Sequence, residues 1–159
     1  MESRELAILA AVIADAKKAH DVVILDFREE SILYDFFVIA SALTRRETRA
    51  IARAVDERVK ALHPSKRIVQ GMQSGFWILL DYGGVVVHVF AEQDRDAPLK
   101  QGFLGRRSKL VANYREYYDI EGLWKDVPRF DFLSEPETAK LQEEYLTGEV
   151  LKEEPQAGE

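Results

Sequence analysis

Apolar residues near the start of the chain follow first a helical and then a strand-like spacing. The helical spacing, which predicts an amphipathic helix, is seen at Leu6, Leu9, Ile13 and Ala16. A short β-branched run at residues 22–25, bounded by charged residues, predicts a buried strand. A second run at residues 34–40, with the sequence YDFFVIA, predicts another strand. The chain therefore opens as one helix followed by two strands.

The next segment has the signals of a capped amphipathic helix. Thr44 precedes Glu47 by three residues, which is the spacing of a capping box. One face of the predicted helix then collects apolar side chains at Ile51, Val55, Val59 and Leu62. Pro64 cannot continue a helix, so we expect the helix to end before it.

Three further apolar runs predict strands at residues 67–70, 77–82 and 85–90. Gly83 and Gly84 between the last two runs are a strong signal for a tight turn, so these two strands should form a hairpin. Residues 117–124 indicate a short helix or turn. This order of elements predicts an α/β fold, with a mixed β-sheet and helices packed over it.

The net charge of −6 is unevenly distributed along the chain. Residues 131–159 carry nine acidic and two basic side chains, whereas residues 1–130 carry nineteen acidic and twenty basic ones. We expect residues 1–130 to form one domain and residues 131–159 to form an acidic, flexible tail. The near-neutral domain argues against a dedicated nucleic-acid binder.

The cysteine content and the N-terminus indicate a compartment. The chain has no cysteine, which excludes disulfides and thiolate metal sites and fits a reducing environment. The first twenty residues lack the cationic start and unbroken apolar run of a secretory signal. The expected location is therefore the cytoplasm.

Residues 91–114 form an unusually long connection, which contains Pro98, Gly102 and Gly105. Loops of this length are usually functional or mobile. The sequence leaves three alternatives for it: an inert surface loop, a contact to rRNA, or an arm exchanged between the subunits of a dimer.

Catalytic patterns are nearly absent. The chain has no Walker loop, dinucleotide fingerprint or nucleophile elbow, and His20, His63 and His88 lack metal-ligand spacing. Asp94 and Asp96 are the best candidate pair, because two such carboxylates hold Mg²⁺ in nucleotidyl transfer. The Gly-Ser phosphate-binding turn of those enzymes is missing upstream, which favours a solvated loop. We expect no enzyme activity, metal or cofactor, with a divergent Mg²⁺-dependent nucleotidyltransferase as the alternative.

His88 allows a structural and a functional interpretation. Strand alternation places Val86, His88 and Phe90 on one face of the hairpin. In the partner strand, Trp77, Leu79 and Asp81 share one face, and Phe76, Ile78, Leu80 and Tyr82 share the other. A single histidine in a strand is usually structural, but Trp, Asp and His side chains close together also form recognition patches. The spacing leaves both interpretations open.

Three blocks in order carry a family resemblance: VVILDFREESILYDFFVIASALTRRETRAIA, WILLDYGGVVVHVF and REYYDIEGLW. Together they strongly resemble the ribosomal silencing factor family, also called Iojap. The ordered similarity runs from about residue 6 to residue 124, apart from the long loop. The strand motif W-x-x-x-D-Y-G followed by H-V-F is specific to this family.

The resemblance implies an α/β fold similar to that of nucleotidyltransferases but without their catalytic residues. It also implies a translation repressor that binds the large ribosomal subunit through its fourteenth protein. Bound there, such a protein sterically blocks association with the small subunit when nutrients are scarce. Family members are often homodimers when free. An assembly factor for the large subunit stays open as an alternative function.

Carried over by motif, the implied docking patch consists of Trp77, Leu80, Asp81, Tyr82 and His88. Tyr118 and Trp124 fall in the closing motif, where packing is the expected role. A peripheral contact with rRNA through Arg45, Arg46 or Arg49 stays open. Two departures stand out: relatives commonly have an acidic residue where Gly84 stands, and their connection at residues 91–114 is much shorter.

Overall fold

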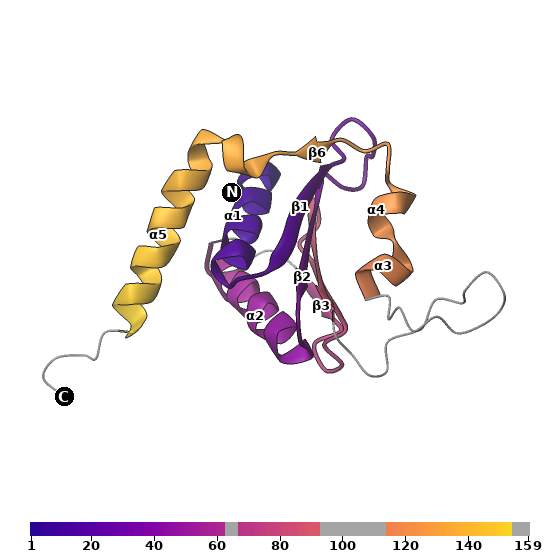
Figure 1. The fold of residues 1–159 in the computed structure, drawn as a ribbon. Helices are drawn as coiled ribbons and strands as arrows, with labels where there is room; N and C mark the ends of the chain where they lie inside the picture. Colours follow the sequence, from indigo (N-terminus) through magenta and orange to yellow (C-terminus); the bar gives the residue numbers. More distant parts are fainter. Residues whose placement is uncertain (63–66, 93–113, 154–159) are drawn as a thin grey trace, which may run out of the picture.

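The computed structural model describes residues 1–62, 67–92 and 114–153, and their helices and strands alternate as an α/β fold requires (Figure 1). The helices are α1 (Ser3–Ala16), α2 (Arg45–Leu62), α3 (Tyr114–Tyr118), α4 (Ile120–Leu123) and α5 (Pro136–Glu153), with a 3-10 turn at Phe132–Ser134. The strands are β1 (His20–Asp26), β2 (Phe36–Ala42), β3 (Ile68–Gln70), β4 (Trp77–Asp81), β5 (Val85–Ala91) and β6 (Arg129–Phe130). Candidate residues Asp94 and Asp96, most of the long loop, and residues 154–159 lie outside these ranges.

The strands of the described chain form one sheet in the order β3-β4-β5-β2-β1-β6. β2 and β5 run parallel in the centre, and every other neighbouring pair is antiparallel. The predicted mixed sheet and the β4–β5 hairpin are therefore confirmed. In the hairpin turn, the Tyr82 backbone N–H donates to the Val85 carbonyl oxygen at 2.9 Å.

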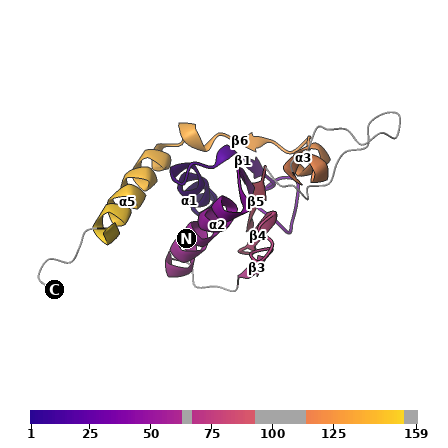
Figure 2. The same ribbon diagram turned by 60° about the horizontal axis from the view of Figure 1, so that its bottom comes forward.

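Helices cover both faces of the sheet, but unequally. α1 and α2 lie against one face, and the short α3 and α4 lie on the other (Figures 1 and 2). Strand alternation sends Val85, Val87 and Val89 toward α1 and α2, and Val86 and Phe90 toward the opposite face. The domain thus has two hydrophobic cores, one on each side of the sheet.

α2 begins with the capping arrangement that its sequence predicts. The Glu47 backbone N–H donates to Thr44 Oγ1 at 3.2 Å, which satisfies one of the free N–H groups at the start of the helix. The Glu47 carboxylate in turn accepts from the Leu43 backbone N–H at 3.2 Å. These two bonds fix where the chain leaves β2 and enters the helix.

α1 is enclosed on all sides, which its reading as an amphipathic helix did not anticipate. All nine residues from 6 to 14 are buried. A helix that is apolar around its whole circumference needs cover on every side. The sheet and α2 supply part of that cover, and α5 lies along the remaining side (Figure 2).

Part of the acidic C-terminal segment, which its composition predicted to be a flexible tail, forms α5 and packs against α1. Phe132 and Tyr145 are buried in the same core as α1. Arg4 of α1 pairs with Glu137 at 2.7 Å and also with Glu135. The acidic residues at the start of α5 thus find a cation in the domain, whereas charge composition alone suggested a solvated tail.

Gly84 is tightly surrounded by other atoms, which leaves little room for a side chain at this position. Its carbonyl oxygen accepts from the backbone N–H groups of Asp35 and Phe36 at 2.7 and 3.0 Å. A Cβ atom at Gly84 would lie 2.7 Å from Ser3 Oγ and 2.8 Å from an Asp35 carboxylate oxygen. An acidic residue here would therefore need both side chains to move.

Among the described residues, none of the helices is both long enough and apolar enough to span a bilayer.

Candidate functional site

Five aromatic side chains gather on the sheet face that carries α3 and α4, and we call them the aromatic face: Phe37, Trp77, His88, Phe90 and Tyr118. The Trp77 ring stacks on Phe90 with centroids 5.2 Å apart and lies 4.8 Å from the Tyr118 ring. His88 lies 4.9 Å from Phe37. These rings come from β2, β4, β5 and α3, so the sheet register sets their arrangement.

Trp77 and His88 share a hydrogen bond within this face. The Trp77 Nε1–H donates to His88 Nδ1 at 3.1 Å. Because an indole N–H can only donate, Nδ1 must be the acceptor and the neutral ring carries its proton on Nε2. Burial lowers the pKa of His88 from 6.5 to about 4, which keeps the ring neutral near pH 7.

His88 is only 4% exposed, so it cannot itself present much surface to a partner. Its Nε2 atom is buried and has no hydrogen-bond partner in the described part of the chain. His88 therefore acts on the aromatic face from beneath, by holding the Trp77 indole in one orientation.

Asp81 lies on the same side of β4 as Trp77 and is half-buried at the end of the strand. Its carboxylate accepts from the Gly83 backbone N–H at 2.9 Å. Gly83 has a φ of 92°, a left-handed conformation that suits glycine. Asp81 thus shapes the hairpin turn at one border of the aromatic face.

Leu80 and Tyr82 point to the opposite side of the sheet, so they do not form a surface patch with Trp77. Leu80 is fully buried, and Tyr82 is 6% exposed in the core beneath α2. The Tyr82 hydroxyl donates to an Asp56 carboxylate oxygen at 3.0 Å. Burial, reinforced by the Asp56 charge, raises the pKa of Tyr82 far above its usual value. The motif resemblance grouped these residues, whereas strand alternation separates them.

Arg49 is half-buried, and its guanidinium is engaged in hydrogen bonds with the backbone. Its guanidinium donates to three successive carbonyl oxygens of the β3–β4 connection, at 2.9 Å to Met72, 2.6 Å to Gln73 and 3.3 Å to Ser74. These bonds pin the loop that leads into Trp77, and the rRNA contact left open for Arg49 stays a prediction.

The other two arginines considered for an rRNA contact, Arg45 and Arg46, differ in their surroundings. The Arg45 guanidinium lies over the Phe76 ring, 4.6 Å from its centroid, in a cation–π contact. Arg46 is exposed at the start of α2. Of the three, Arg46 is the best placed for an electrostatic contact with a partner.

Several further large apolar side chains are exposed. Tyr118 and Trp124 are 47% and 39% exposed, although packing was their expected role. The Trp124 ring also contacts buried Phe27, with centroids 5.3 Å apart. Ile32 and Leu33, in the β1–β2 connection, are strongly exposed. Two adjacent apolar residues within a charged loop were the available sequence signal.

The described residues contain no group of three or more His, Asp or Glu side chains arranged to hold a metal ion. The site is an aromatic surface on one face of a mixed α/β sheet.

The chain belongs to the ribosomal silencing factor family. The family model described as ribosomal silencing factor during starvation matches residues 1–97. A ribosomal silencing factor of Bacillus subtilis is 28% identical over 131 residues, covering 82% of this chain and 94% of that protein. That of Halalkalibacterium halodurans is 30% identical over 128 residues, covering 80% and 92%. A crystal structure of a protein from Chromobacterium violaceum superposes with a TM-score of 0.62 at 29% identity, covering 79% and 88%.

Proposed function

We propose that this protein represses translation by binding the large ribosomal subunit through its fourteenth protein, which prevents the small subunit from joining. The observation that carries the proposal is membership of a family named for silencing ribosomes during starvation. The proposed activity takes place in the cytoplasm, where the subunits meet.

The proposed docking surface consists of Trp77, Asp81, Tyr118 and Trp124, with His88 as a positioning residue. Half-exposed aromatic side chains are typical of binding hot spots, because they bury a large area while losing little conformational entropy. Asp81 supplies a charge at the border, where it would favour a basic partner. Leu80 and Tyr82 are left out of this surface because they are buried on the other side of the sheet.

The proposed mechanism is steric and needs no chemical step. A protein bound at the joining surface excludes the other subunit in proportion to its occupancy. The proposal has two further parts. The free protein is a homodimer, as the family resemblance implies, and the exposed Arg46 makes a peripheral contact with rRNA.

The test is sedimentation of the protein with purified large subunits, followed by a subunit-joining assay. We expect Trp77→Ala and Tyr118→Ser to weaken both binding and inhibition at least tenfold. Leu62→Ser is the matched control, because Leu62 is an exposed apolar residue on α2, across the sheet from the docking surface. Circular dichroism verifies that each variant is folded.

Two results would contradict the proposal. If both aromatic variants bind as tightly as the parent, the proposed docking surface is wrong. If the parent protein does not bind large subunits at all, the proposed function is wrong. Preferential binding to precursor particles in the same gradients would instead support an assembly factor.

A further inference from the structure

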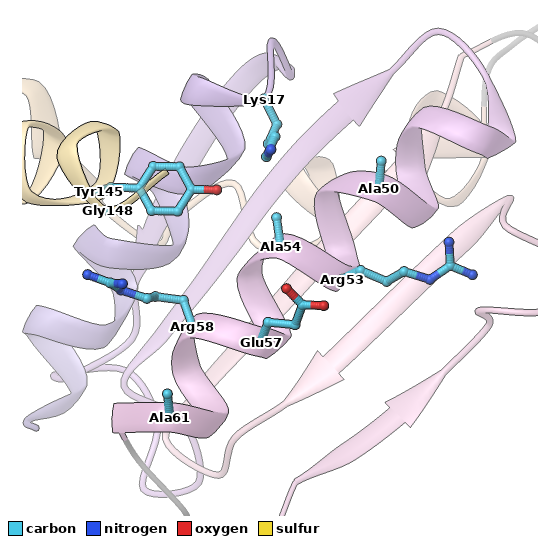
Figure 3. A pocket seen from close by; sticks show the side chains of 9 residues that line it. All are labelled: Lys17, Ala50, Arg53, Ala54, Glu57, Arg58, Ala61, Tyr145 and Gly148. Carbon is cyan, nitrogen blue, oxygen red and sulfur yellow. The ribbon is translucent and has the colours of Figure 1, made fainter. Parts of the chain in front are cut away.

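A cavity of about 250 Å³ lies between α2 and α5, on the side of the molecule away from the aromatic face (Figure 3). α2 and α5 form its two long walls, and Lys17, just after α1, stands at one end. Three alanines of α2 line one wall, and their short side chains leave space in the cavity. Its distance from the aromatic face gives this cavity no role in the proposed docking.

The polar side chains around the cavity are mainly basic. Lys17, Arg53 and Arg58 line it together with a single acidic residue, Glu57, although the whole chain has a net charge of −6. In Figure 3 the Lys17 amine and the Tyr145 hydroxyl point into the space between the helices, and the Arg58 guanidinium extends toward α5. Arg53 extends away from α5, so Lys17 and Arg58 are the cations nearest to the ring of Tyr145.

Arg58 has a buried donor that the described part of the chain does not satisfy. Its Nε atom is inaccessible to solvent and has no hydrogen-bond partner there. A buried donor without a partner costs about 1–3 kcal/mol, and more when the group is charged. Such donors are rare in folded proteins, so Arg58 is held in this position at a cost in free energy.

Gly148 keeps the cavity open next to Arg58. It lies within α5, where a glycine costs about 1 kcal/mol relative to alanine. A Cβ atom at this position would meet Arg58 Nη1 at 3.6 Å, an ordinary contact, so close packing does not require the glycine. What the missing side chain does provide is space beside the guanidinium.

We propose that this cavity binds the phosphate group of a small molecule. Arg58 supplies the planar donors that match phosphate oxygens, Lys17 adds a compact positive charge, and the Tyr145 hydroxyl adds a further polar group. The Tyr145 ring and the alanines form an apolar wall for the remainder of the ligand. A nucleic acid fits less well, because α5 carries five acidic and two basic residues and would repel an extended polyanion.

A bound phosphate would connect α2, α5 and the end of α1. Ligands that bind only the folded arrangement stabilise it in proportion to their occupancy. Binding would therefore strengthen the attachment of α5, and a thermal shift reports it independently of any ribosome assay.

The test is calorimetric titration of the full chain with pyrophosphate, ADP and adenosine, with a short RNA oligonucleotide as a fourth probe. We expect pyrophosphate and ADP to bind and to raise the melting temperature. Arg58→Met should weaken both at least tenfold, and Gly148→Leu should block them by filling the cavity. Lys60→Met is the control, since Lys60 is an exposed cation on α2 that does not line the cavity.

Tighter binding of ADP than of pyrophosphate would show that the apolar wall contributes to binding. Equal binding would show that only the phosphate group is recognised. The proposal is overturned if neither binds, if Arg58→Met binds like the parent, or if adenosine binds as tightly as ADP. RNA binding that depends on Arg58 and is tighter than ADP binding would overturn it in favour of a nucleic-acid site.

Discussion

The Trp77 indole and the His88 imidazole are joined by a hydrogen bond of 3.1 Å between neighbouring strands. The two residues are diagonal neighbours, because Leu79 stands opposite His88 and Phe90 stands opposite Trp77 in the β4–β5 register. The bond gives the half-exposed Trp77 ring a fixed orientation and gives the buried histidine a defined tautomer. Trp77 is partly exposed, and buried His88 fixes its orientation.

The first prediction concerns pH. Because the pKa of His88 is about 4 in the folded state and 6.5 in the unfolded state, only the unfolded chain takes up this proton between those values. Stability should therefore fall as the pH drops below about 6.5, with the loss complete below about 4. At about 1.4 kcal/mol per pKa unit, the total contribution is about 3 kcal/mol.

Urea unfolding at several pH values measures this effect, with His88→Gln as the comparison. A glutamine amide can accept from Trp77 without titrating, so the variant should have a flatter pH profile between 6.5 and 4. Parallel profiles for parent and variant would show that His88 does not control acid stability.

The second prediction concerns the hydrogen bond beneath α2. Tyr82→Phe removes the hydroxyl that donates to Asp56 at 3.0 Å, and we expect a loss of about 1–2 kcal/mol in the free energy of unfolding. Asp56 keeps its ion pair with Arg67, which limits the loss. Tyr34→Phe is the control and should change stability little, because no hydrogen bond joins the Tyr34 hydroxyl to the described chain. Equal losses in the two variants would contradict a specific role for the Tyr82 hydroxyl.

The third prediction concerns Arg49. Arg49→Lys replaces a planar fork by a single ammonium group, which cannot reach all three carbonyl oxygens of residues 72–74. Backbone amides of residues 71–76 should exchange hydrogen several-fold faster, as measured by mass spectrometry. Arg46→Lys should leave this exchange unchanged. If Arg49→Lys also leaves it unchanged, the loop is held by other contacts.

The fourth prediction concerns the attachment of α5. Tyr145 is buried against α1, so Tyr145→Ala should destabilise the protein by about 3 kcal/mol and increase the binding of a hydrophobic dye. The neighbouring Leu146 is exposed, and Leu146→Ala should be nearly neutral. Similar melting temperatures for the two variants would show that α5 contributes little to the fold.

Much of the central fold follows from local patterns in the sequence. The Thr44 and Glu47 cap, the glycine turn of the hairpin and the alternation of residues 85–90 each depend on near neighbours in the chain. Such features can be predicted from the sequence because the residues that cause them lie within a few positions of one another. The family prediction is confirmed for the same reason, since its motifs fall on these elements.

Features that depend on distant contacts could not be predicted in this way. The sequence near Arg49 does not reveal the carbonyl groups of residues 72–74, because only the folded loop brings them together. The family resemblance grouped Leu80 and Tyr82 with Trp77, whereas strand alternation in the sequence already placed them on opposite faces of the sheet, as the structure does. The attachment of α5 depends on Arg4, which lies 131 residues before Glu135.

The enclosure of α1 by α5 has a consequence for how the chain is made. α1 precedes α5 in the chain, so one side of α1 stays uncovered until α5 has left the exit tunnel. Until then, the nascent protein presents the uncovered apolar side of α1 to chaperones and to other unfinished chains. A chain truncated before residue 136 would lack α5 and would keep that apolar side of α1 exposed. We expect such a chain to be recognised by chaperones and proteases and degraded.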